Sequence, residues 1–388
     1  MMSRRVTVPQ ICVCILFRIQ VITFTMRTLQ NLTIKNFKSI RDQSLDLGQL
    51  NIFIGGNGAG KSNLVTVFKF LHEIVNQRLA EYTLRRGGAD TILHFGRATS
   101  RRMEFSLKFG EGAKANGYKI VLQGTDEDGL IVESEIASYH ERHKYPSPYE
   151  LPISVFINEA KIRTQNDLCA RQVVADLDSY RVYHFHDTSD TAPVKALCNV
   201  DDNRYLRPQA ENLAAFLYWL QEKQPDHFSM ITDTVQQIAP FFGGFRLAPL
   251  RLNETKIRLE WFERGSDAYF NATSLSDGTL RFICLVTLLL QPDLPTVILV
   301  DEPELGLHPA AITLLADLIS SAATRTQVIV ATQSVTLVNQ FEPDDVWAVD
   351  RLDNDSVFHH LSASDMTQWL DDYALGELWE KNLVGARP

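Results

Sequence analysis

Residues Gly55–Ser62 read GGNGAGKS and satisfy the pattern G-x-x-x-x-G-K-[S/T] at every position. The apolar segment NIFI precedes this stretch, and an amphipathic helical pattern follows it over residues 63–75. Backbone N–H groups in such a loop, together with the helix N-terminus, attract phosphate, and glycines allow close approach. We therefore predict a phosphate loop for a nucleoside triphosphate. Its expected residues are Gly55, Asn57, Gly58, Ala59, Gly60, Lys61, Ser62 and Asn63.

Two side chains of this loop have predicted individual roles. Lys61 is expected to reach the β- and γ-phosphates, and the Ser62 hydroxyl is expected to ligate Mg²⁺. The alternative is a glycine-rich turn that carries a solvated lysine. The position of the loop, after a strand and before a helix, favours the phosphate loop.

A second acidic motif lies far downstream, where Val297–Pro303 reads VILVDEP. The apolar run is typical of a strand buried on both faces. Asp301 at its end is predicted to hold Mg²⁺ through water, and Glu302 to orient or deprotonate an attacking water. The alternative, a strand that simply ends in an acidic turn, is disfavoured by the phosphate loop upstream.

Two further motifs flank this strand. Ser274–Arg281 reads SLSDGTLR before a very apolar helix, and Glu304–Pro309 reads ELGLHP after the acidic pair. This order resembles the heads of ABC-type ATPases. The opening TIKNFKSI and the loop form GxNGAGKSN resemble the RecF/SMC branch. The closing GELWEKNLVGARP is similar to stand-alone bacterial RecF-like predicted ATPases, related to overcoming-lysogenization-defect proteins but without their nuclease domain. The resemblance covers residues 26–388.

The resemblance implies ATP and Mg²⁺ as ligands and a homodimer, or a higher homo-oligomer, in which two heads sandwich two ATP molecules. Ser276 and Gly278 match the signature serine and second glycine, which bind the γ-phosphate of the opposite protomer. Asp277 lies between them where many relatives carry glycine, so it is expected to point away or to pair with Arg281. Gln333 replaces the usual switch histidine; it can orient a water but cannot take a proton. The Q-loop glutamine is not assigned.

The implied fold is α/β: an ABC-type P-loop ATPase head with a mixed sheet, helices on both faces, an antiparallel β subdomain and a helical arm. Residues 1–25 are expected to be an extension before a natural start at Met26. Residues 26–200 form the expected nucleotide-binding lobe with a β-rich insertion. A helical arm and strand pair follow over 201–272, the strands at 245–252 and 256–262. Residues 273–388 carry the signature, the acidic strand and the C-terminal segment.

Composition excludes several classes of protein. The 388 residues are 45% hydrophobic, as in globular proteins, and the net charge is 38 − 47 = −9, so there is no global basic footprint. The apolar run Ile11–Phe17 is too short to span a membrane, and no membrane partner is expected. The odd cysteine count, without a CxxC, favours a reducing cytoplasm. The five cysteines are Cys12, Cys14, Cys169, Cys198 and Cys284.

Two weaker motifs leave alternatives open. His184, His186 and Asp187 in HFHD, on a strand predicted over 181–187, suggest either a metal site or a packed strand end near Mg²⁺. Asp353 and Asp355 form a D-x-D that suggests either a nuclease centre or a hairpin turn, and the turn composition of LDNDS favours the second.

Basic clusters suggest either a DNA path across the heads or a solvated basic face. They are Lys35, Lys38 and Arg41; Arg85 and Arg86; and Arg97, Arg101 and Arg102.

The predicted biochemical function is ATP hydrolysis coupled to dimerisation. The chain carries neither a recognisable nuclease domain nor long coiled coils, which favours regulation of a separately encoded effector protein, possibly a nuclease, in anti-phage defence. The alternative is a DNA-binding genome-maintenance ATPase of RecF type. A transporter ATPase fits the signature and the C-terminus poorly.

Overall fold

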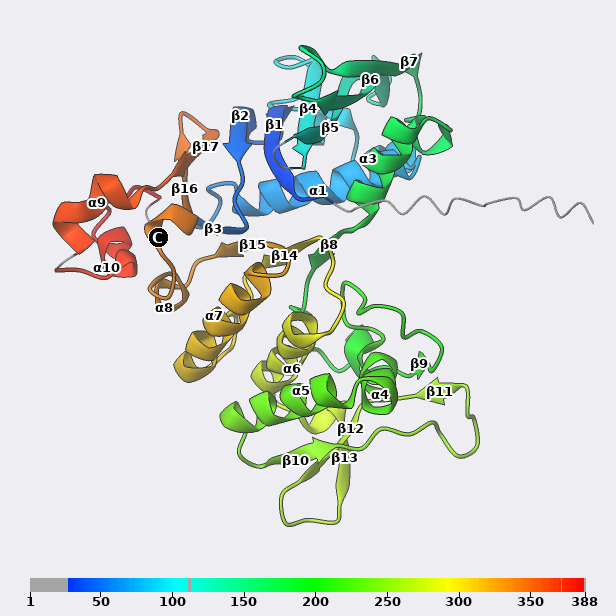
Figure 1. Cartoon of the computed structure of the whole chain (residues 1–388), viewed down its shortest axis with the longest axis vertical. Coiled ribbons are helices and arrows are strands. Elements are labelled where there is room, and N and C mark those ends of the chain that lie inside the picture. Colours follow the sequence, from blue (N-terminus) through cyan, green and yellow to red (C-terminus); the bar gives the residue numbers. More distant parts are fainter. Residues whose placement is uncertain (1–26, 111–112, 371, 387–388) are drawn as a thin grey trace, which may run out of the picture.

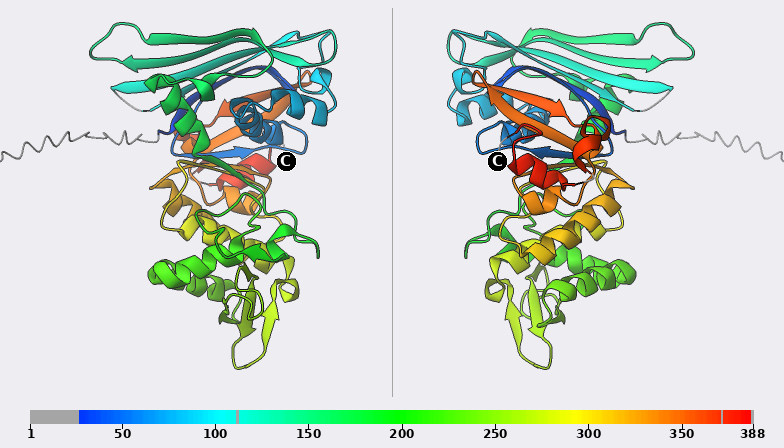
Figure 2. Two further views of the ribbon diagram at one scale, coloured as in Figure 1. Left: turned by 90° about the vertical axis from the view of Figure 1, so that its right-hand side faces the viewer. Right: turned by 90° about the vertical axis from the view of Figure 1, so that its left-hand side faces the viewer.

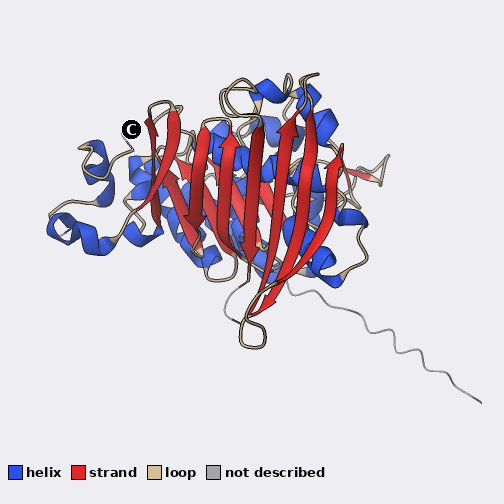
Figure 3. Cartoon of the chain, turned by 90° about the horizontal axis from the view of Figure 1, so that it is seen from above, coloured by secondary structure: helices blue, strands red, loops and turns tan. Residues whose placement is uncertain are grey.

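The structure is a computed structural model that describes residues 27–110, 113–370 and 372–386 (Figure 1). The predicted extension over residues 1–25 lies outside this part. An antiparallel sheet of six strands has the order β2-β1-β4-β5-β6-β7. Its strands are β1 (Leu29–Phe37), β2 (Ile40–Asp46), β4 (Arg102–Phe109), β5 (Lys114–Gly124), β6 (Leu130–Glu141) and β7 (Tyr149–Ile157). Figure 3 shows that no helix of the described part of the chain covers its outer face.

A second six-stranded sheet has the order β17-β16-β3-β15-β14-β8. Its strands are β3 (Leu50–Ile54), β8 (Tyr180–Tyr183), β14 (Val297–Asp301), β15 (Gln327–Thr332), β16 (Val346–Leu352) and β17 (Asp355–His360). All neighbours are parallel except β17, which pairs antiparallel with β16. Every residue of β3, β14 and β15 is buried, as expected for parallel strands covered on both faces.

Helices cover both faces of this second sheet (Figures 1 and 2). Between the two sheets lie α1 (Lys61–Val75), α2 (Leu79–Arg85) and α3 (Leu168–Asp178). Against the other face or beside it lie α4 (Leu213–Lys223), α5 (Pro225–Ile238), α6 (Asp277–Leu290), α7 (Pro309–Ala323), α8 (Val335–Val338), α9 (Ala363–Leu370) and α10 (Leu375–Glu380). Short 3₁₀ turns are η1 (Ala89–Thr91), η2 (Ile162–Thr164), η3 (Pro193–Lys195), η4 (Ala272–Ser274) and η5 (Pro343–Asp345).

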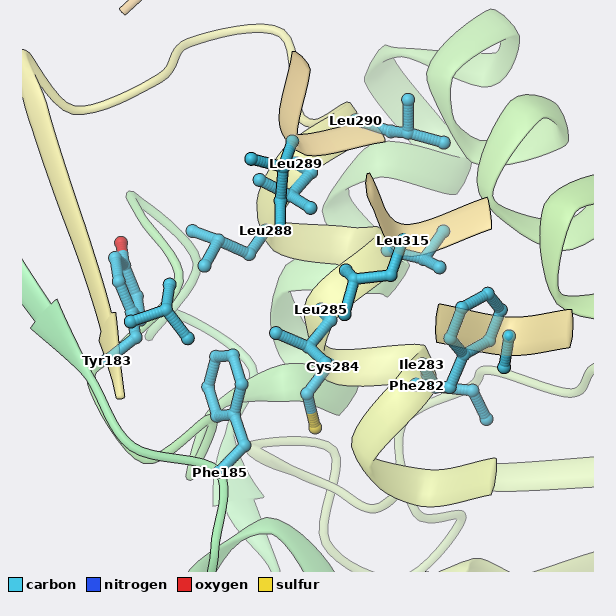
Figure 4. Close-up of a cluster of buried hydrophobic side chains, with 14 of the residues drawn as sticks. Tyr183, Phe185, Phe282, Ile283, Cys284, Leu285, Leu288, Leu289, Leu290 and Leu315 are labelled. Carbon is cyan, nitrogen blue, oxygen red and sulfur yellow. The ribbon is translucent and has the colours of Figure 1, made fainter. Parts of the chain in front are cut away.

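The sheet separates two hydrophobic cores. One core fills the space between the sheets around α1. The other lies beneath the parallel sheet around α6, and Figure 4 shows part of it, including Tyr183, Phe185 and Cys284. Within the described residues, no helix combines the length and the apolarity that crossing a membrane requires.

The predicted α/β class with its mixed sheet and antiparallel β subdomain is confirmed, and the strand predicted at residues 29–37 matches β1. The segment predicted as a helical arm packs directly on α6, since α5 and α4 join the lower core. The predicted strand over residues 181–187 is too long. It ends at Tyr183, because the His184 N–H donates to Pro208 O (2.9 Å) and so leaves the sheet.

The strand pair predicted over residues 245–252 and 256–262 is wrong. Instead β10 (Phe242–Phe245) pairs with β12 (Glu260–Glu263), which pairs with β13 (Tyr269–Asn271). The short β11 (Lys256–Ile257) pairs with β9 (Cys198–Asn199). Gly243 explains the register of β10, because a Cβ at this position would overlap the ring of Phe262 across the pair.

A buried glutamine joins the two large sheets. Gln327 at the start of β15 is only 1% exposed. Its Oε1 accepts a hydrogen bond from the Leu29 N–H (2.9 Å), and its Nε2 donates to Leu29 O (2.9 Å) and to Gly48 O (2.7 Å). The side chain thus satisfies backbone groups of β1 and of the turn before β3.

We predict that Gln327→Leu lowers the free energy of unfolding by about 2–4 kcal/mol, because a shape-similar apolar side chain leaves buried backbone groups without partners. Urea denaturation, monitored by circular dichroism, measures this free energy of unfolding. The control Gln340→Leu, at an exposed position, should stay within about 0.5 kcal/mol of the unmodified chain. Equal stability of the two variants would contradict the role of Gln327.

Candidate nucleotide-binding site

The phosphate loop connects β3 to α1 and takes a shape that only glycine permits. Gly55 has φ 155° and Gly60 has φ 126°. A Cβ on Gly55 would overlap the carbonyl oxygen of Val349, and one on Gly60 would overlap the Ser356 hydroxyl. Both contacts come from the β16–β17 hairpin, so the loop is packed against a segment almost 300 residues further along the chain.

Hydrogen bonds fix the loop between that hairpin and the β1–β2 turn. The Ser356 hydroxyl donates to Ala59 O (2.5 Å), and the Ser356 N–H donates to Ser39 O (2.7 Å). The two serine hydroxyls lie 2.6 Å apart, and Asn63 Nδ2 donates to Ser39 Oγ (2.7 Å). Sequence reasoning missed Ser39 and Ser356, since isolated serines in turns carry no motif.

Lys61 begins α1 and lies across the mouth of the loop. It is 5% exposed, and its ammonium donates to Gly55 O (2.5 Å) and Gly56 O (3.1 Å). Burial lowers the pKa of Lys61, and the carboxylates of Glu302, Asp301 and Glu304 oppose that shift. The lysine therefore lies within the electric field of the acidic motif.

The rest of the loop presents its polar groups outward. Asn57, Gly58 and Ser62 are exposed, and Ala59 is buried. The first turn of α1 contains no acidic residue that would oppose an anion.

Asp301 ends β14 next to the phosphate-loop side of the sheet. It is 9% exposed, and its Oδ1 is buried without a hydrogen-bond partner among the described residues. Burial, followed by the neighbouring Glu302, raises the pKa of Asp301. A cation would satisfy such a carboxylate oxygen, and carboxylate and hydroxyl oxygens are donors that Mg²⁺ prefers. Asp301 and the exposed Ser62 therefore fit a magnesium ion chemically.

Glu302 and Gln333 face each other across the ends of β14 and β15. Glu302 has φ 44°, which is uncommon outside glycine, and the Gln333 side-chain amide donates to its carboxylate. Glu304 supports this pair, because its Oε1 accepts from Thr332 Oγ1 (2.6 Å) and from the Gln333 N–H (3.0 Å). Burial raises the pKa of Glu304. Sequence reasoning gave Glu304 no role, although it lies in the quoted ELGLHP segment.

The predicted signature lies at the start of α6. Ser276 caps the helix, and its Oγ accepts from the Thr279 N–H (3.2 Å). Gly278 packs so closely on the Gly306 carbonyl that a Cβ would overlap it. Where the chain is described, no hydrogen bond or ion pair joins Ser276, Asp277 or Gly278 to the phosphate loop. One chain therefore does not bring these two motifs together.

Asp277 and Arg281 have different surroundings. Asp277 is exposed, whereas Arg281 is 5% exposed. The Arg281 guanidinium donates to the carbonyls of Phe185 (2.9 Å), His186 (3.1 Å) and Leu305. Asp277 thus points to solvent and does not pair with Arg281.

The histidine motif contributes to packing beside the acidic strand. His186 Nε2 lies 2.7 Å from the Asp301 carbonyl oxygen, and the rings of His184 and His186 are 5.9 Å apart. Asp187 is exposed and accepts from the Ser189 hydroxyl (2.7 Å). The described residues contain no cluster of three or more His, Cys, Asp or Glu residues that could hold a metal ion.

The D-x-D motif is a hairpin turn, as its composition favoured. Asp353 and Asn354, the two residues between β16 and β17, have φ 49° and 71°. Asp355 lies 3.1 Å from His94 Nε2.

Five of the eight basic residues in the three clusters already have acidic partners. The pairs are Arg41–Asp355, Arg85–Glu73, Arg97–Asp90, Arg101–Asp126 and Arg102–Glu133.

A cavity of 670 Å³ lies beside Asn63, at the start of α1. The aromatic side chain of Phe95, which is 55% exposed, lines this cavity. Lys38 and Arg351 also line the cavity. Its volume is within the range of small-ligand sites, and sequence reasoning missed it.

Residues 50–339 match a family model described as "AAA domain, putative AbiEii toxin, Type IV TA system". The chain belongs to this family. The matched range contains the phosphate loop, the acidic pair and Gln333.

Solved structures support the fold of this AAA-family chain. An SMC head bound to the C-terminal winged-helix domain of ScpA is similar with a TM-score of 0.53 and 16% identity, covering 88% of this chain and 99% of that one. The SMC head with an extended coiled coil, bound to the C-terminal domain of ScpA derived from Pyrococcus furiosus, gives 0.51 and 15%, covering 89% and 99%. The predicted ABC/SMC-type P-loop fold is therefore confirmed.

We predict that Thr332→Val destabilises the protein by about 2–3 kcal/mol, because it removes a donor to Glu304 and leaves the Ser334 N–H without its acceptor. Thr332→Ser keeps the hydroxyl and should cost about 1 kcal/mol for one lost methyl group. Urea titration of both variants tests this. A valine variant as stable as the serine variant would be inconsistent with the hydrogen-bond network.

Proposed function

We propose that this AAA-family chain hydrolyses ATP with Mg²⁺ and that two copies close on two ATP molecules. The observation that carries the proposal is the convergence of the phosphate loop, Asp301, Glu302 and Gln333 at the carboxyl ends of the adjacent strands β3, β14 and β15. A colorimetric assay of phosphate release from ATP, with and without Mg²⁺, tests it directly.

In this proposal each residue has one task. The backbone of residues 55–60 and the N-terminus of α1 bind the phosphates, and Lys61 moves from the loop carbonyls to the β,γ-phosphate charge. Ser62 and Asp301 would hold Mg²⁺, which neutralises charge that develops on the phosphates. Glu302 orients the attacking water and accepts its proton, and Gln333 holds the Glu302 carboxylate in place.

The cavity beside Asn63 is the proposed place of the nucleoside. It adjoins the first turn of α1, and the exposed Phe95 ring offers a stacking surface to a base. Aromatic stacking tolerates any base, so the proposal does not assign base specificity to Phe95.

Dimerisation is proposed because one chain leaves the site incomplete. Ser276, Asp277 and Gly278 are separate from their own phosphate loop, and Ser276 is exposed at a helix N-terminus, where backbone N–H groups favour an anion. A second copy would place these residues on the γ-phosphate of the first.

For the biological role we propose control of a separately encoded effector, possibly a nuclease, in anti-phage defence in the cytoplasm. The family description, which names a toxin and a toxin–antitoxin system, supports a defence context. The alternative is a RecF-type ATPase that binds DNA. The ion pairs that already neutralise most residues of the basic clusters weigh against it.

We predict that Glu302→Gln lowers the turnover number for ATP by at least about 100-fold, because the amide cannot accept the proton of the attacking water. ATP should still bind, so the variant should accumulate as an ATP-dependent dimer on size exclusion with light scattering. Glu263→Gln, at an exposed position on β12, is the matched control and should keep normal turnover. A Glu302→Gln chain that turns over ATP normally would refute the assigned role.

We predict that Ser276→Arg still binds ATP but neither dimerises nor hydrolyses it, because a bulky cation blocks the partner's γ-phosphate. Ser320→Arg, on the exposed side of α7, is the control. Lys61→Ala alone should also be inactive, since it removes the charge at the phosphates.

Mixing Ser276→Arg and Lys61→Ala chains should restore part of the activity. Each mixed dimer contains one site with an intact phosphate loop from one chain and an intact signature from the other. Full activity of Ser276→Arg by itself would show that each copy works alone, and the sandwich mechanism would then be wrong.

A further inference from the structure

A second groove, of 850 Å³, lies further along α1 and belongs to neither the phosphate loop nor the cavity beside Asn63. Its walls are α1, α2, β8 and residues 205–211. The His184 N–H donates to Pro208 O (2.9 Å), and the Tyr183 hydroxyl donates to Leu206 O (3.3 Å), so the last wall is fixed to the end of β8. The groove is thus formed by ordered elements from three distant parts of the chain.

Cations without acidic partners line this groove. The Lys69 ammonium makes no hydrogen bond or ion pair among the described residues. The Arg86 guanidinium forms no ion pair in the same part of the chain and lies over the Tyr82 ring, 5.2 Å from its centroid. Among the residues that the structure describes, Arg181 donates hydrogen bonds only to the backbone carbonyls of Asp178 and Tyr180.

Two of the three carboxylates in the same groove are already paired with arginines, and the third, Glu211, accepts a hydrogen bond from the Gln209 N–H (3.0 Å). Glu73 accepts from Arg78 (2.7 Å), and Asp178 accepts from Arg163 (2.9 Å). The groove therefore keeps an excess of positive charge in a chain whose net charge is −9. Such an excess is costly inside a partly enclosed space unless an anion compensates it.

The groove also offers groups that recognise more than charge. His184 Nε2 is buried without a hydrogen-bond partner among the described residues. Burial, together with Lys69 and His186, lowers the pKa of His184 to about 4, so its ring is neutral at pH 7 and can donate or accept. Tyr205 is 45% exposed at the rim, and Arg181 lies over its ring at 5.1 Å.

We propose that this groove binds a nucleoside phosphate, with the phosphate between Lys69 and Arg86 and the base on the free face of Tyr205. Arg and Lys are the residues that bind phosphate, and an exposed aromatic ring beside them is the usual platform for a base. The volume suits a ligand of this size. The phosphate belongs either to a free nucleotide or to the 5′ end of a nucleic-acid strand.

This proposal is independent of ATP hydrolysis, because it uses no residue of the phosphate loop or of the acidic motif. A nucleoside monophosphate also lacks the β-phosphate that Lys61 is expected to hold. Binding of a monophosphate therefore reports on the groove, and repeating each titration with Lys61→Ala shows whether the loop contributes.

Isothermal titration of the full chain with each of the four deoxynucleoside 5′-monophosphates tests the site. We expect one molecule per chain, weakened at least about tenfold by Arg86→Ala and by Tyr205→Ala, since a charge-assisted hydrogen bond or a stacked base is worth about that factor. Arg101→Ala, which removes the same charge from an exposed surface outside the groove, should leave the affinity unchanged.

Single-stranded probes distinguish the two sources. A 5′-phosphorylated pentathymidylate that binds more tightly than both its unphosphorylated form and the monophosphate supports a strand end. A monophosphate that binds as tightly as the phosphorylated strand, or more tightly, supports a free nucleotide.

Three results would overturn the proposal. One is that the deoxynucleoside monophosphates do not bind, or that Arg86→Ala does not weaken their binding. Another is tight and equal binding of the phosphorylated and unphosphorylated strands, which would mean that backbone phosphates suffice. The third is a hexaglutamate peptide that binds as tightly as the phosphates, which would point to an acidic protein segment instead.

Discussion

The lack of space around the phosphate loop is the constraint on which the site depends. Gly55 and Gly60 are covered by Val349 and Ser356 of the β16–β17 hairpin, and no side chain larger than hydrogen fits at either position. The loop is therefore not a flexible glycine-rich segment. Its carbonyl at Ala59 is hydrogen-bonded to Ser356, so its backbone N–H groups have fixed directions before any anion arrives.

The acidic side of the site follows from a second constraint, which is burial. Asp301 ends the buried strand β14, Glu304 lies in the turn that follows it, and burial raises the pKa of each. Among the described residues, Glu304 Oε2 and Asp301 Oδ1 are both buried without a hydrogen-bond partner, but Glu304 is held in place by the two donors to its Oε1. The structure thus separates a carboxylate that supports Gln333 from one that is open to a cation.

Sequence predicted the parts of this site that depend on local pattern. The glycine spacing located the loop, and the four-residue apolar run before Asp301 located the central strand, because both signals lie within a few residues. The Ser39–Ser356 contact and the cavity at Phe95 could not be predicted, since each joins segments that are distant in the chain. The predicted strand pair at residues 245–262 was wrong for the same reason. The close contact between Gly243 of β10 and Phe262 of β12 fixes how these two strands pair, and the two residues lie far apart in the sequence.

The order of the strands in the parallel sheet determines when, during synthesis, the phosphate loop can form. Strand β3 emerges early in synthesis, but its neighbours β15 and β16 are made 328 − 50 = 278 and 346 − 52 = 294 residues later. At about 5–20 residues per second, this delay is on the order of tens of seconds. During that interval β3 has no partners in its own sheet and the glycine loop has no hairpin to hold it. A nascent chain therefore cannot form the loop until β17 has been made, and a ribosome that stalls earlier leaves an apolar strand exposed to other chains.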